Sequence, residues 1–165
     1  MLEFEMRRKI ILLLEVYLNI VAFNGLFWYD WIKAKREDMG KEFIVYKGSE
    51  FTIEWYYNDR GKSSSKIYFD DLDRERKLEA FELFMTMAKI GKIFNITKFR
   101  SEGDGIYAFK PKPDRFLCFF YSGKKIIITN AFEKKQDKLS PAEKKKALNC
   151  QKDYKTRVEE GVYYE

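Results

Sequence analysis

Three β-prone segments follow one another closely in the second half of the chain, and their short connections restrict the fold more than any other feature. They cover residues 106–110, 115–121 and 125–132. Pro111 and Pro113 close the first segment, and Ser122-Gly123 makes a tight turn into the third. Connections this short join antiparallel neighbours, so the sequence predicts a three-stranded antiparallel meander.

A strand and a helix are predicted before the meander. Residues 51–57 alternate and are rich in β-formers, so they predict a strand, and the polar residues 58–65 predict a loop. Asp70-Asp71 offers the N-cap of a helix that Gly91 ends. The apolar positions that recur at helical spacing, and that we expect in the core, are Leu78, Phe81, Met85 and Ala88.

The final helix has the clearest local signal in the chain. Ser140-Pro141-Ala142-Glu143 is a capping box with proline at the first helical position, and Gly161 ends the helix. One face of this helix carries Ala147, Gln151, Tyr154 and Val158. The order predicts a small α+β domain over residues 51–165, with a mainly antiparallel sheet of one N-terminal strand plus the meander and packed helices.

Residues 1–50 predict an extra N-terminal helical segment. The apolar run at residues 10–23 resembles a signal peptide or membrane span, but Glu15 and Asn19 interrupt it and it is shorter than the roughly 20 apolar residues a span needs. The Asn24-Gly25 pair marks a break. We expect this segment to pack on the following domain or on a second copy, with self-association through residues 1–45, no membrane contact and a cytoplasmic location.

The positive charge is concentrated in one stretch. The chain has a net charge of +6, and residues 98–157 hold sixteen Lys and Arg against seven Asp and Glu. This surplus suits a polyanion such as nucleic acid, although a solvated basic face is an equal alternative. Cys118 and Cys150 are far apart, with Cys118 in an apolar run. With only these two and no histidine, we expect no metal site and no cofactor.

Several ordered motifs resemble RelE/HigB-type toxins of type II toxin–antitoxin systems, particularly the phage-derived HigB-like branch of the RelE/ParE superfamily. The similar stretches are Lys98-Phe99-Arg100, residues 105–110, residues 115–120, residues 126–135 and the final helix with Ala147, Tyr154 and Arg157. The resemblance covers about residues 51–158. This chain departs from the motifs at three positions: Ala108 replaces a glutamate, Lys110 replaces an arginine, and Asn130 replaces a histidine.

The resemblance implies a RelE-like fold and a metal-independent, ribosome-dependent endoribonuclease that cleaves mRNA, in which the ribose 2′-hydroxyl attacks the adjacent phosphate. It also implies a cognate antitoxin, often a helix-turn-helix protein, with mRNA and the ribosome as further partners. It assigns Lys98, Lys110 and Arg115 to phosphate contact and charge stabilisation, with Lys98 or Lys110 as base, and Tyr154 to the 2′-oxygen or a base. The implied RNA-binding residues are Arg100, Lys112, Lys134, Lys135, Lys144, Lys145 and Arg157.

Other interpretations stay open at this point. Lys110 and Arg115 can be solvated strand ends, Tyr154 can be a packing residue, and Glu102 with Asp104 is interpreted as a loop rather than a carboxylate pair. The missing histidine favours a second hypothesis, a RelE/ParE-fold protein without RNase activity, such as a gyrase inhibitor or regulatory module. The N-terminal segment favours a third, an assembly role.

Overall fold

The computed structural model describes residues 43–135 and 138–165. Its contacts divide the chain into two compact units, Met1–Gly40 and Lys41–Glu165, and the description below concerns the second. The predictions made for residues 1–42, which include the helical segments and the break at Asn24-Gly25, lie outside the described residues.

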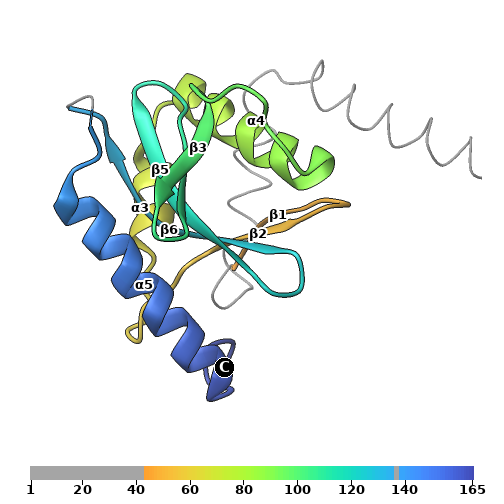
Figure 1. The fold of residues 1–165 in the computed structure, drawn as a ribbon, viewed down its shortest axis with the longest axis vertical. Coiled ribbons are helices and arrows are strands. Elements are labelled where there is room, and N and C mark those ends of the chain that lie inside the picture. Colours follow the sequence, from red (N-terminus) through yellow and green to blue (C-terminus); the bar gives the residue numbers. More distant parts are fainter. Residues whose placement is uncertain (1–42, 136–137) are drawn as a thin grey trace, which may run out of the picture. The chain divides into compact units, whose positions relative to one another are not determined.

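A six-stranded mixed sheet forms the centre of the second unit (Figure 1). Its strands follow the spatial order β1-β2-β6-β5-β4-β3. All neighbours are antiparallel except β2 and β6, which are parallel. The strands are β1 Ile44–Lys47, β2 Thr52–Trp55, β3 Phe99–Gly103, β4 Ile106–Phe109, β5 Asp114–Tyr121 and β6 Lys125–Glu133. The α+β class and the meander are confirmed, while β1 and β3 are strands that the sequence did not predict.

Three helices pack on this sheet: α3 Ser64–Asp71, α4 Arg74–Ile90 and α5 Pro141–Glu159. The predicted loop at residues 58–65 is therefore wrong at its end, because Ser63 caps α3 through its side chain. The prediction that Asp70-Asp71 caps a helix is also wrong. These residues end α3, and the side chain of Asp73 accepts the capping bond from the backbone N–H of Arg76. None of the helices described is long and apolar enough to cross a membrane.

The buried face of α4 differs from the predicted stripe. Leu78 was expected in the core but is 40% exposed. Ala88 is buried as predicted, and the other fully or almost fully buried positions are Ala80, Phe84 and Met87. Because α4 carries apolar residues on adjacent helical faces, spacing alone did not determine which of them faces the sheet.

Hydrophobic clusters cover both faces of the sheet. On one face, Leu72, which directly follows α3, and Phe84 of α4 pack against Trp55, Phe116 and other strand residues. On the opposite face, α5 packs through Ala147 and Tyr154 against Leu117, Phe119 and Ile127. Figure 1 shows α4 and α5 on opposite sides of the strands. The sheet is thus a central layer, and successive residues of each strand point alternately towards α4 and towards α5.

The start of α5 confirms the predicted helix but not the predicted capping box. Ser140 precedes the helix without a side-chain capping bond, and Pro141 occupies the first turn. The carboxylate of Glu143 instead accepts a 2.7 Å hydrogen bond from the side-chain amide of Asn130 in β6. A tertiary contact has therefore replaced the local one.

Candidate functional site

Strand alternation gathers charged side chains on the α5 face of the sheet. Arg100 and Glu102 lie two residues apart in β3, and Lys110 follows β4. Arg115 lies in β5, two residues before Leu117, which belongs to the hydrophobic cluster that packs against α5. Because positions two apart in a strand share a face, the three neighbouring strands deliver these four side chains to one side of the sheet.

A shallow surface hollow lies at this place. The β6–α5 connection adds Lys134, Lys138 and Leu139 to its wall. Ala108, Leu117 and Phe132 form an apolar floor next to the charged groups. The charged residues that line it are Arg100, Glu102, Arg115, Lys134 and Lys138. Among the described residues, four cations and one carboxylate thus surround a single opening.

Glu102 is the electrostatic centre of the hollow. Its Oε1 accepts from Arg100 Nε at 2.9 Å and lies 3.2 Å from Lys110 Nζ, while its Oε2 has only a longer contact of 3.4 Å with Arg100. The Glu102 side chain is only 10% exposed. Burial raises its pKa, but the hydrogen bonds and charges of Arg100 and Lys110 outweigh burial and hold the pKa below its ordinary value. Glu102 is therefore ionised at neutral pH.

Two of the cations are poorly solvated. The Lys110 side chain is 5% exposed, and burial lowers its pKa although Glu102 partly offsets the effect. Burial also lowers the pKa of Arg115. The interpretation of Lys110 as a solvated strand end is therefore wrong. Cations that have lost much of their hydration interact more strongly with a phosphate than exposed ones do.

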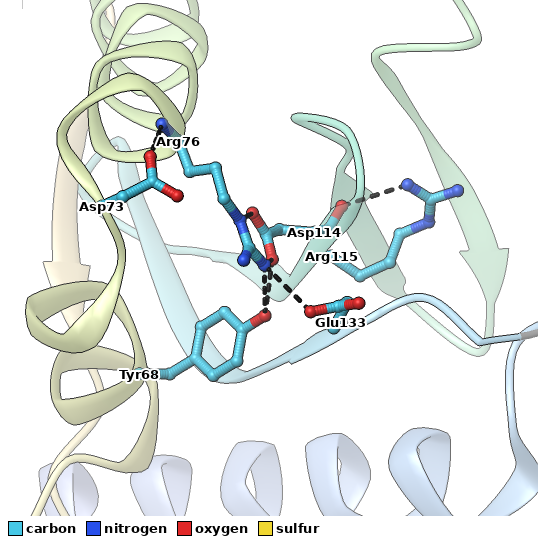
Figure 2. Close-up of polar contacts among 6 residues, drawn as sticks. All are labelled: Tyr68, Asp73, Arg76, Asp114, Arg115 and Glu133. Carbon is cyan, nitrogen blue, oxygen red and sulfur yellow. Dashed lines mark hydrogen bonds and ion pairs between the residues drawn. The ribbon is translucent and has the colours of Figure 1, made fainter.

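A second network holds the start of β5 in place. Asp114 is fully buried and accepts from Arg76 Nε at 2.9 Å and from the Tyr68 hydroxyl at 2.5 Å. Arg76 also contacts Glu133 at the end of β6. Figure 2 shows Arg76 and Tyr68 converging on Asp114 while Arg115 points away from them. The network fixes Asp114 towards α3 and α4, and so alternation turns Arg115 into the hollow.

Some predicted catalytic residues lie elsewhere. Lys98 forms an ion pair with Glu79 of α4 and does not line the hollow. Tyr154 is fully buried in the α5 cluster, where its hydroxyl hydrogen-bonds to Tyr164, and burial raises its pKa to about 12. The structure thus brings Lys110 and Arg115 together, whereas Lys98 and Tyr154 lie away from both.

The predicted RNA-binding residues divide in the same way. Arg100 and Lys134 line the hollow. Lys144, on the first turn of α5, pairs with Asp104 in the β3–β4 turn. Arg157 donates to the Tyr57 carbonyl and to Asp153 near the other end of α5. The remaining predicted RNA-binding residues, which have exposed side chains, are Lys112, Lys135 and Lys145.

Asn130, which stands at the position of the motif's histidine, is buried and held by hydrogen bonds to neighbouring side chains. It is fully buried in β6, its side-chain oxygen accepts from Thr129, and its amide donates to Glu143. The hydrogen bond to Glu143 links β6 to α5.

Two residues of the site were missed by sequence reasoning. Glu102 was assigned to a loop, although it lies in β3, and Lys138 was not considered. The alternation of Arg100 and Glu102 two residues apart was the available signal for Glu102. Lys138 is brought to the hollow by the path of a connection, for which no sequence signal exists.

The donor set suits anion binding. In the part of the chain that the structure describes, no group of three His, Cys, Asp or Glu side chains could hold a metal ion. The described lining of the hollow instead offers two guanidinium groups and two ammonium groups, which bind phosphate through charge-assisted hydrogen bonds. Its single carboxylate can accept a proton. The arrangement can therefore hold a phosphodiester and assist a proton transfer beside it.

A family model of the phage-derived Gp49-like proteins (DUF891) matches residues 67–152. The chain belongs to the Gp49-like family. Every residue that lines the hollow falls inside the matched stretch. The Gp49-like family is a RelE/HigB-like toxin family, so the predicted resemblance is confirmed at this level. The finer assignment to the HigB-like branch stays a prediction. No curated protein matches the chain.

Proposed function

We propose that this Gp49-like protein is the toxin of a type II toxin–antitoxin system and an endoribonuclease that cleaves mRNA on the ribosome. The observation that carries the proposal is the hollow itself. Three strands and the β6–α5 connection converge to place Arg100, Arg115, Lys134 and Lys138 around one opening within the family-matched stretch, and Lys110 pairs with Glu102 in its wall. Such a cluster suits the sugar-phosphate backbone of RNA.

The proposed reaction uses the RNA's own 2′-hydroxyl as nucleophile. Attack on the adjacent phosphorus develops extra negative charge on the phosphate oxygens, and cations placed beforehand stabilise that charge. Arg115 and Arg100 can each present two parallel donors to phosphate oxygens, while Lys134 contributes a point charge. Positioning and electrostatic stabilisation are therefore the main contributions of these side chains.

The proposed partners follow from the same surface and from the family. Exposed lysines near the hollow, such as Lys135 and Lys145, fit contacts with ribosomal RNA phosphates, which give affinity without sequence information. The proposed regulator is a cognate antitoxin, of the helix-turn-helix kind that the resemblance implies.

Induced expression tests the proposal. We expect the wild-type chain to stop growth and to produce mRNA fragments cut within codons. An Arg115→Ala/Lys134→Ala variant should relieve both effects, because it removes two cations from the hollow. The matched control is Arg60→Ala/Lys62→Ala, which removes the same two charges from an exposed loop. Growth arrest with intact mRNA would refute cleavage, and a DNA-damage response in its place would select gyrase inhibition.

A further inference from the structure

Among the described residues that line the hollow, Glu102 is the only one with a carboxylate. The surrounding Lys and Arg side chains are hydrogen-bond donors with no acceptor capacity when charged, whereas an ionised carboxylate only accepts. A reaction that begins at a ribose hydroxyl needs a group to receive its proton. Within the hollow, Glu102 is the side chain with the chemistry for that step.

We infer that Glu102 is the general base of the proposed RNA cleavage and receives the 2′-hydroxyl proton on its Oε2. The inference rests on the proposed function and adds a catalytic residue to it. Oε1 is held by Arg100 Nε at 2.9 Å and by Lys110 Nζ at 3.2 Å, whereas Oε2 has the single longer contact of 3.4 Å. The two cations orient the carboxylate and leave one oxygen for the substrate.

The small side chain at position 108 provides the space for this arrangement. Ala108 is paired with Arg100 across β3 and β4, and it lies between Ile106 and Lys110 on the same strand face. Ala108 and Glu102 both line the hollow. The ion pair between Glu102 and Lys110 therefore passes over Ala108. A glutamate at position 108 would bring its own carboxylate into the same space.

The step balances without a further reactant. The 2′-oxygen forms a bond to phosphorus as its proton moves to Glu102, and the bond from phosphorus to the 5′-oxygen breaks. Solvent water protonates the leaving 5′-oxygen, and Glu102 returns its proton to the solvent. The products are a 2′,3′-cyclic phosphate and a 5′-hydroxyl end. Arg115, fixed in direction by the Asp114 network, stabilises the charge on the phosphate oxygens (Figure 2).

The pH profile distinguishes a base from a merely structural carboxylate. The charged groups around Glu102 are Arg100 and Lys110, which contact it, and the described residues Arg115, Lys134 and Lys138, which line the same hollow. These are cations whose ordinary pKa values lie far above the acid range, so Glu102 is the group among them that titrates there. We expect the wild-type single-turnover rate to be level near neutrality and to fall about tenfold per pH unit below the pKa of Glu102.

The test measures mRNA cleavage by the full-length chain on programmed ribosomes. Glu102→Gln should lower the rate by about 100-fold or more and remove the acid limb of the profile. Glu79→Gln, which neutralises the carboxylate paired with Lys98 on the opposite face of the sheet, is the matched control and should keep the wild-type rate and profile. Circular dichroism and melting confirm that each variant is folded.

A rescue variant tests whether the missing carboxylate itself accounts for the lower cleavage rate. Glu102→Ala/Ala108→Glu returns a carboxylate to the hollow from the neighbouring strand, so its rate should exceed that of Glu102→Ala. A Glu102→Gln rate equal to the wild-type rate, or a wild-type profile without an acid limb, would overturn the inference while leaving the proposed function in place. A wild-type chain that leaves the mRNA intact would overturn the proposed function itself. The acid limb is measured on the wild-type chain, so it decides the matter even where a variant does not fold.

Discussion

The ionisation of Glu102 links the hollow to the stability of the fold. Its pKa lies below the ordinary value in the folded chain, because Arg100 and Lys110 outweigh burial. A group with a lowered folded pKa stabilises the fold above its unfolded pKa, which is about 4.3 for glutamate, and loses that contribution as the pH falls through the folded value. We therefore expect the difference in Tm between wild type and Glu102→Gln to be largest near neutrality.

Melting curves at several pH values check this expectation. The Tm difference should narrow as the pH falls from neutrality into the acid range, since protonation removes the same charge that the variant lacks. A difference that stays constant over the whole range would show that the ion pairs of Glu102 do not stabilise the fold.

Asp114 gives a prediction on stability that is separate from the hollow. It is fully buried, and Arg76 contacts both Asp114 and the exposed Glu133. Asp114→Ala should lower the free energy of unfolding by about 3 kcal/mol, because it leaves Arg76 and Tyr68 without their shared acceptor. Glu133→Gln should change it by less than about 1 kcal/mol, because that pair is solvent-exposed. Urea denaturation measures both, and equal effects would contradict this description of the network.

The helix starts provide a matched comparison of two capping residues. Asp73 makes a 2.9 Å side-chain bond to the backbone N–H of Arg76, whereas Ser140 makes no side-chain capping bond. Asp73→Ala should therefore cost about 1 kcal/mol of unfolding free energy, and Ser140→Ala should stay within about 0.5 kcal/mol of wild type. Chemical denaturation of both variants checks this. A larger loss for Ser140→Ala would mean that the capping box of the sequence does form.

The predictability of each element followed from how local its signals are. The meander could be predicted because Pro111, Pro113 and Ser122-Gly123 mark its turns in sequence. β1 could not be predicted, because it is a strand of four residues at the edge of the sheet, and so short a run carries little local signal. α3 is short and begins among serines that read as a loop, so its signal was equally weak.

The site shows the same division between local and distant information. Lys110 and Arg115 could be predicted because they flank a turn within resembling motifs. Glu102 depended on the register of β3, which is set by pairing with β4 rather than by its own composition. Lys98 precedes the first residue of β3, so strand alternation does not place it beside Arg100, and it pairs instead with Glu79 on α4. The charged residues could therefore be identified from the sequence, whereas the arrangement of the strands determines which of these side chains lie close together.

At the scale of the whole molecule, the unit Lys41–Glu165 contains both hydrophobic clusters and the hollow. Self-association through residues 1–45 stays a prediction from the apolar N-terminal sequence. Deletion of residues 1–40 should lower the oligomeric mass of the purified protein while the circular dichroism signal of the sheet persists. Light scattering gives the mass, and an unchanged mass would contradict the assembly role.

The central claim is that the charged hollow cuts mRNA on the ribosome. It is tested most directly by mapping the ends of an mRNA held on purified ribosomes after addition of the wild-type protein or Arg115→Ala. The account predicts cuts within the codon in the A site, with 2′,3′-cyclic phosphate and 5′-hydroxyl ends, and strongly reduced cutting by Arg115→Ala. An mRNA that stays intact with the folded wild-type protein bound to the ribosome would contradict it.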